Sequence, residues 1–146
     1  MMRLRLWSLG GFLAMAGGLV AVLASGNLLS LNPTVILVQM VAISLIIWAR
    51  RSLGMRSFHL SAEPTQGHLV MTGPYRIIRH PIYAANCLLI YPGVLVHHSL
   101  TASALATLVT AGALIRMFCE ERILPRSYPE YARYACTTKR MIPYLF

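Results

Sequence analysis

The stretch GPYRIIRHPIY, residues 73–83, places two prolines, two arginines and a histidine between long apolar segments of the chain. Its Gly-Pro and His-Pro pairs are turn and helix-start signals. Pro81 would occupy the first position of a helix, so His80 would lie near the N-cap. The free N–H groups there and the positive end of the helix dipole favour an anionic group, and Arg76 and Arg79 would strengthen that field. The stretch therefore predicts a basic helix start between apolar helices.

The composition of the chain indicates a membrane protein. Of its 146 residues, 57% are hydrophobic and 12% are charged, and the mean hydropathy is +0.62. A soluble domain usually carries about 25% charged residues, so we expect an all-α integral membrane protein forming one domain over residues 1–146. The net charge of +9 would suit nucleic acid only on a soluble face. We therefore expect anionic membrane lipid as a partner and no nucleic acid.

Four apolar segments predict about four transmembrane helices: Trp7–Ala24, Thr34–Ala49, Tyr83–Val96 and Leu100–Phe118. A span needs roughly 17–25 residues. The second segment reaches that length if it starts near Leu29, and the third is short and predicts a kinked or tilted helix at Pro92-Gly93. Small residues in the first segment predict close helix contacts, with the second span or a second copy; these are Gly10, Gly11, Gly17 and Gly18.

The distribution of charge predicts the orientation of these spans. The links at 25–33 and 97–99 contain no charged residue, whereas all 13 lysines and arginines lie in the N-terminal tip, in the 50–82 loop or from Arg116 onward. With four spans these three regions share one side, and the positive-inside rule makes that side cytoplasmic. We therefore expect both termini, the 50–82 loop and the tail in the cytoplasm.

The cysteines and histidines predict no metal site. The three cysteines show no CxxC pairing and suit small packing residues in a reducing compartment. His59, His68 and His80 share one loop, but their spacing fits no short metal-ligand motif.

Charged residues at the end of the fourth apolar segment are the second candidate site. Arg116 and Glu120 are four residues apart and share a helical face, and Glu121 follows directly. Two of the four acidic residues of the chain are therefore adjacent here. Charges so close to hydrocarbon are costly and usually functional, although an Arg116–Glu120 structural pair would look the same. Pro125 is expected to end this helix.

The tail SYPEYARYACTTKRMIPYLF, residues 127–146, predicts a short helix that starts at Pro129. Tyr131 and Tyr134 would share one face of it, which is typical of packing against the membrane or the loop.

Together these segments resemble a known family. The loop GHLVMTGPYRIIRHPIY (67–83), with EERIL (120–124), YPEYARY (128–134) and KRMIP (139–143), resembles the isoprenylcysteine carboxyl methyltransferase family, which is related to the phospholipid N-methyltransferases. The resemblance extends from about Arg50 to Pro143. It implies a membrane enzyme that uses S-adenosylmethionine. The implied cofactor pocket is cytoplasmic and closed by the 50–82 loop, the end of the last span and the tail.

Matching positions imply the roles of individual residues. The implied cofactor contacts are His68, Leu69, Val70, Tyr75, His80, Pro81, Tyr83 and Glu120, and Glu121 completes the glutamate pair that the phospholipid branch needs for cofactor binding. Arg116 matches the position that orients the carboxylate of the substrate. These roles agree with the chemistry, since a helix start suits the cofactor's carboxylate and a glutamate can accept from its amine or ribose hydroxyls.

The predicted reaction is methyl transfer to a lipophilic acceptor at the membrane surface. The acceptor would be a carboxylate, as in O-methylation of a prenylated substrate, because a guanidinium at Arg116 would disfavour a cationic amine. Three alternatives stay open: a phospholipid N-methyltransferase, a nicotinamide-dependent membrane reductase of related architecture, and a non-catalytic membrane subunit or lipid-binding adaptor. The ligand that binds, S-adenosylmethionine or NADPH, separates a methyltransferase from the reductase.

Overall fold

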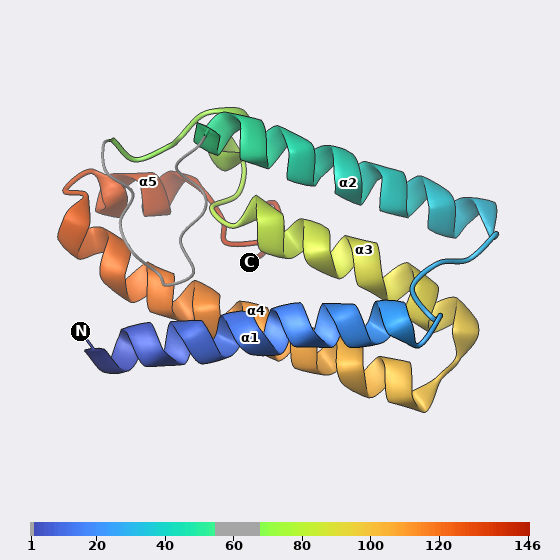
Figure 1. Cartoon of the computed structure of the whole chain (residues 1–146). Helices are drawn as coiled ribbons and strands as arrows, with labels where there is room; N and C mark the ends of the chain where they lie inside the picture. The colour runs from blue at the N-terminus through green and yellow to red at the C-terminus, as the bar shows by residue number, and fades with distance from the viewer. Residues whose placement is uncertain (1, 55–67) are drawn as a thin grey trace.

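The computed structural model describes residues 2–54 and 68–146 and shows a helical protein (Figure 1). Its elements are α1 (Met2–Ala24), α2 (Pro33–Leu53), the 3-10 helix η2 (Gly73–Arg76), α3 (Pro81–His97), α4 (Leu100–Ser127) and α5 (Tyr131–Thr137). α1, α2 and α4 are long and apolar enough to cross a membrane, and α3 is a shorter apolar helix of 17 residues. The prediction of an all-α membrane protein is confirmed.

Capping residues determine where α2 begins. The Asn32 side chain accepts a hydrogen bond at 2.9 Å from the N–H two residues further on, and Pro33 occupies the first turn. Asparagine is a strong N-cap residue and proline suits the first helical position. These signals outweigh the apolar residues before them, so the expected start near Leu29 is wrong. α2 gains its length at the opposite end, where it continues to Leu53.

Pro125 does not end α4, contrary to the expectation from the sequence. α4 continues to Ser127 with Pro125 inside it, because a proline so near the C-terminal end disturbs only the final turns of a helix. The short tail helix also starts two residues later than expected. Pro129 lies in the turn before it, and α5 begins at Tyr131.

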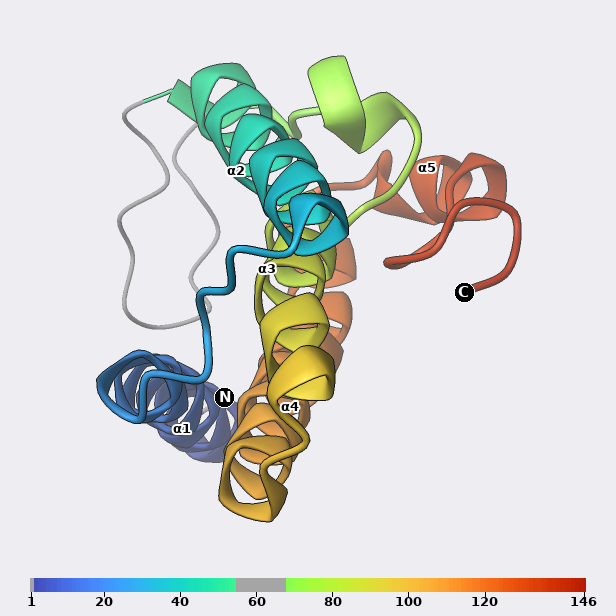
Figure 2. The same cartoon turned by 90° about the vertical axis from the view of Figure 1, so that its right-hand side faces the viewer.

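Glycines allow α1 to lie close against α4 (Figures 1 and 2). A Cβ atom at Gly11 would lie 2.7 Å from the carbonyl oxygen of Gly112, and a Cβ at Gly18 would lie 2.6 Å from a valine methyl of α4. Both approaches are too close for a larger residue. For Gly10 and Gly17, no atom of the described part of the chain lies within 4 Å of such a Cβ. Close helix contacts are therefore confirmed for Gly11 and Gly18, and their partner is α4 rather than α2.

The Pro-Gly pair of α3 lets another segment of backbone pack directly against this helix. α3 stays helical through Pro92, and a Cβ at Gly93 would lie 2.0 Å from the carbonyl oxygen of Leu28. The connection between α1 and α2 therefore passes directly over α3. Gln39 of α2 fixes this crossing, because its amide donates to the Leu28 carbonyl at 2.7 Å and to the Leu89 carbonyl at 3.0 Å.

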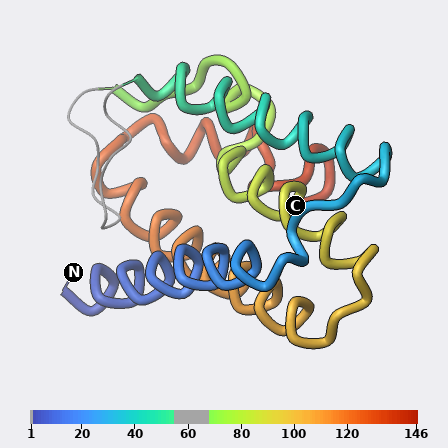
Figure 3. Tube along the Cα trace, turned by 45° about the vertical axis from the view of Figure 1, so that its right-hand side comes forward, coloured from blue at the N-terminus to red at the C-terminus, as the bar shows by residue number. Residues whose placement is uncertain are grey.

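One end of the bundle gathers the segments that the sequence singled out. The end of α2, η2, the start of α3, the end of α4 and α5 all lie there (Figures 1 and 3). The tail joins the loop before α3 through a parallel bridge between Ile78 and Lys139. The Arg79 N–H donates to the Lys139 carbonyl at 2.7 Å, and the His80 N–H donates to the Arg140 carbonyl at 2.8 Å. This bridge holds the tail against the start of α3.

Candidate functional site

The two glutamates at the end of α4 hold two different sets of partners. Glu120 accepts a hydrogen bond from the Tyr83 hydroxyl at 2.7 Å and from Nε of Arg116 at 3.1 Å. Arg116 also donates to the Tyr83 hydroxyl at 2.8 Å, and its guanidinium lies over the Phe12 ring of α1 at 5.2 Å. Glu120 therefore belongs to a cluster at the junction of α1, α3 and α4. Arg116 and Glu120 share a helical face as the spacing predicted, and they form the ion pair expected for the structural alternative.

Glu121 faces the loop and the tail. Its Oε1 accepts from Nε of Arg79 at 2.8 Å and from the Tyr131 hydroxyl at 2.9 Å, and Nε2 of His80 lies 2.9 Å away. Its Oε2 accepts from Nη2 of Arg79 at 3.3 Å, and Nε of Arg140 lies 3.7 Å away. Only 13% of the Glu121 side chain is exposed, compared with 22% for Glu120. The Glu121 carboxylate is thus fully engaged by the protein itself.

Arg79 connects this carboxylate to the tail. Besides its two bonds to Glu121, its Nη1 donates to the Ala135 carbonyl at 3.0 Å and to the Thr138 carbonyl. A bidentate arginine–carboxylate pair is among the stronger and more directional polar interactions. The prediction from sequence included Arg79 only as a contributor of positive charge. Backbone carbonyls cannot be recognised as arginine partners from the sequence. The only signal for Arg79 was its position directly before the His-Pro pair.

His80 bridges the two glutamates. Its Nδ1 lies 3.5 Å from Oε2 of Glu120 while Nε2 contacts Glu121, and 6% of the residue is exposed. Burial alone lowers the pKa of His80, but hydrogen bonds to both carboxylates and their negative charges outweigh burial, so the pKa lies above its ordinary value. His80 therefore favours the charged form at the centre of this network.

The raised pKa of His80 predicts a pH-dependent stability. A raised folded-state pKa contributes stability that is fully present below the unfolded-state pKa of about 6.5 and is lost as pH rises through the folded-state value. We expect the unfolding midpoint of the detergent-purified protein to decrease as the pH is raised from about 6.5 to the raised pKa of His80. His80→Asn should remove most of that dependence, whereas His98→Asn, at an exposed histidine, should keep it. A wild type and His80→Asn with equal slopes would refute this role.

The remaining predicted site residues lie around this network. Pro81 is buried at the start of α3, and the backbone carbonyl of the buried Tyr75 accepts from the Tyr134 hydroxyl at 2.7 Å. Burial raises the pKa of Tyr134 to about 12, so this hydroxyl stays a donor. Leu69 packs on a cluster of three tail tyrosines. His68 is exposed and Val70 is half-buried. The structure therefore gathers His80, Tyr83, Arg116 and both glutamates, and leaves His68 and Val70 at the periphery.

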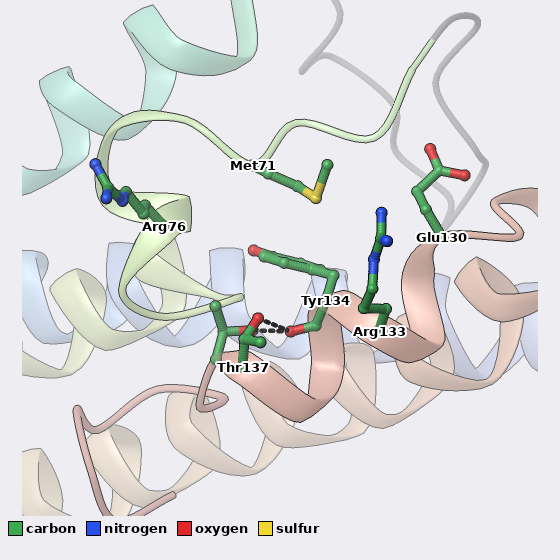
Figure 4. A pocket seen from close by; sticks show the side chains of 7 residues that line it. Met71, Arg76, Glu130, Arg133, Tyr134 and Thr137 are labelled. Atoms are coloured by element: carbon green, nitrogen blue, oxygen red, sulfur yellow. Dashed lines mark hydrogen bonds between the residues drawn. The ribbon is translucent and has the colours of Figure 1, made fainter.

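A pocket of about 270 Å³ lies between the loop and α5 (Figure 4). Its lining residues are Met71, Arg76, Glu130, Arg133, Tyr134, Thr137 and Thr138. None of the ten residues predicted from the sequence lines it, although Tyr75 and Leu69 are neighbours of its walls. The pocket and the glutamate network thus lie on the same loop–tail junction.

The described residues contain no group of three or more histidine, cysteine or acidic side chains placed to hold a metal ion. His59, the first of the three loop histidines, lies outside the described residues.

Comparisons with known proteins agree with the motifs of the loop and the helix end. The phospholipid methyltransferase family matches residues 32–131. The cobalt-zinc-cadmium resistance protein CzcN of Cupriavidus metallidurans is 38% identical over 82 residues, or 53% of this chain. The nickel-cobalt-cadmium resistance protein NccN of Alcaligenes xylosoxydans is 38% identical over 80 residues, again 53% of this chain.

These matches extend over a limited part of the relatives. The matched segments make up 36% of CzcN and 37% of NccN, so the chain spans little more than a third of their length. No solved structure matches the chain. The family match covers more than half of the chain and includes the loop, α3 and the paired glutamates, which confirms the resemblance inferred from the sequence. The chain belongs to the phospholipid methyltransferase family.

Proposed function

We propose that the protein is a membrane methyltransferase that uses S-adenosylmethionine and acts on a lipophilic acceptor at the cytoplasmic membrane surface. One observation carries the proposal. Four ionisable side chains lie together at the start of α3 and at the polar end of α4. They are the two glutamates Glu120 and Glu121, the buried His80 and the buried Arg116. Buried charges beside hydrocarbon are costly and usually functional, and the family match supports methyl transfer as the function.

The residues at this place fit the chemistry of the cofactor. S-adenosylmethionine carries a carboxylate, an amine, ribose hydroxyls and an adenine ring, and when bound it supplies an electrophilic methyl group. Within residues 2–54 and 68–146, Oε2 of Glu120 contacts only His80, at 3.5 Å, so it can accept a further bond from an amine or a hydroxyl. Nε of Arg140 is buried without a hydrogen-bond partner among the described residues, so it can donate to a carboxylate. The site thus offers both an acceptor and a donor.

The contribution of the protein would be positioning and exclusion of water. His80, Tyr83 and Glu120 are held by one another, so the groups that orient the cofactor are fixed before it binds. Fixed geometry and a dry site can supply most of the acceleration of a displacement at carbon. We propose the same binding role for the flanking positions, which are His68, Leu69, Val70, Tyr75 and Pro81. Glu121, whose carboxylate is already engaged, would support cofactor binding by holding Arg79 and His80 in place.

Arg116 bears on the choice of acceptor. It is 8% exposed and lies among α1, α3 and α4, where an acceptor from the bilayer would arrive. A guanidinium there would orient a carboxylate, which favours O-methylation of a lipophilic acid. Its Nε is already paired with Glu120, and this partial neutralisation favours a second candidate, N-methylation of a phospholipid amine. The family match supports that candidate too.

Calorimetry on the detergent-purified protein tests the proposal. We expect S-adenosylmethionine to bind and NADPH not to bind. Transfer of a radiolabelled methyl group to a farnesylcysteine analogue or to phosphatidylethanolamine then distinguishes the two acceptors. A folded protein that binds NADPH in place of S-adenosylmethionine would make the reductase reading correct, and one that binds neither would favour the adaptor.

A further inference from the structure

The tail after Arg140 forms a compact turn with outward apolar side chains. The Phe146 carbonyl accepts from the N–H groups of Met141 and Ile142, each at 2.7 Å, and the Phe146 N–H donates to the Ile142 carbonyl at 3.1 Å. The exposed fractions are 51% for Ile142, 92% for Tyr144 and 79% for Leu145. We call these three side chains the tail patch. The backbone bonds fix the turn, so the exposure belongs to an ordered structure.

The tail patch is fixed at the depth of the last apolar turns of α4. Met141, at the start of the turn, is buried against Tyr83, Ala113 and Met117. Figure 1 shows the C-terminal end at the level of the first turns of α3 along the bundle, and Figure 2 shows it on the side opposite α1. The turn therefore lies beside the apolar part of the bundle rather than beyond its end.

The surface next to the tail patch is also apolar and exposed. Phe118 of α4 is 46% exposed at the end of an apolar helix long enough to span a membrane. The Arg140 guanidinium lies 5.9 Å from the Phe118 ring and 5.4 Å from the Phe146 ring. Aromatic rings beside a long basic side chain are typical of the membrane–water interface. The tail patch therefore continues an exposed apolar surface of α4, a helix long enough to span a membrane.

We propose that the tail patch inserts into the bilayer interface and anchors the tail to the membrane. Apolar side chains gain about 25 cal/mol per Å² on leaving water, and Lys139 and Arg140 would add attraction to anionic headgroups. Arg140 lies 3.7 Å from Glu121, so the anchored turn would hold this cation at the glutamate network. The anchor would thus fix one wall of the proposed cofactor site from the lipid side.

Fluorescence quenching by brominated lipid tests the anchor. Trp7 and Trp48 are replaced by phenylalanine, a single tryptophan is introduced as Tyr144→Trp, and the protein is placed in nanodiscs of brominated phosphatidylcholine and phosphatidylglycerol. We expect bromine to quench this tryptophan severalfold more than that of the matched control Arg133→Trp, at an exposed position of α5. Leu145→Trp provides a second probe if the first variant unfolds.

The quenching experiment tests the anchor without any cofactor or methyl acceptor. Quenching of the Tyr144→Trp and Leu145→Trp probes no stronger than that of Arg133→Trp would overturn the anchor. Weak quenching combined with a dimer in analytical ultracentrifugation would assign the tail patch to a second copy, which also overturns it. The readout needs no methyl transfer, so failure of the anchor and failure of the proposed function are separable.

Discussion

Glu120→Gln is expected to weaken the binding of S-adenosylmethionine by about 10- to 100-fold, because a hydrogen bond to a charged group contributes about 1.5–3 kcal/mol. Among the described residues the Glu120 Oε2 atom has a single contact, at 3.5 Å with His80, so it has room for a further donor. Glutamine keeps a carbonyl oxygen for Tyr83 and Arg116, so the variant should stay folded. Calorimetry gives the affinity, and the unfolding midpoint in detergent checks the fold.

Glu130→Gln is the matched control for this variant. Glu130 lies before α5 and lines the loop–tail pocket, and the structure gives its carboxylate no ion pair within the described residues. The same loss of one charge there should leave the affinity within about twofold of wild type, as surface charges contribute little. If Glu120→Gln bound the cofactor as tightly as Glu130→Gln, the assignment of Glu120 to the cofactor would be wrong.

Arg79→Ala should destabilise the protein by about 3–5 kcal/mol, since removing one partner leaves a buried charge uncompensated. The side chains of Arg79 and Glu121 are only 7% and 13% exposed. The variant would also strip the Ala135 and Thr138 carbonyls of a donor. We therefore expect a lower unfolding midpoint and faster tryptic cleavage after Lys139 and Arg140, followed by mass spectrometry.

Arg76→Ala is the control for this second variant. Arg76 lies three residues earlier and is exposed at the pocket, so its loss should change the midpoint little. A double-mutant cycle with Glu121→Gln should show a coupling energy of about 1–3 kcal/mol. Equal midpoints and equal cleavage rates for Arg79→Ala and Arg76→Ala would show that the tail does not depend on this arginine.

The helices and the glutamate cluster followed from the sequence because their signals are local. Apolar runs define α1, α2 and α4, and the four-residue spacing places Arg116 beside Glu120 on one helix. Helix ends were less predictable: Pro125 looked like a stop, but a proline in the final turns does not outweigh a helix that is already packed.

Contacts between distant segments could not be predicted from one sequence. Ile78 and Lys139 pair through backbone atoms alone, so no side-chain pattern records the bridge. The pairing of α1 with α4 depends on Gly11 meeting Gly112, and small residues occur in several spans. The role of Arg79 depends on two tail carbonyls, those of Ala135 and Thr138, which lie near it only in the folded protein.

The bridge between Ile78 and Lys139 also has a consequence for biosynthesis. It joins two backbone segments that are synthesised at different times. The His80 N–H, for example, donates a hydrogen bond to the Arg140 carbonyl. The loop before α3 is synthesised first, and it lacks its backbone partners until residues 139–140 have been synthesised. The candidate site would therefore be completed only after residues 139–140 have been synthesised, later than the helices that carry its glutamates and its histidine.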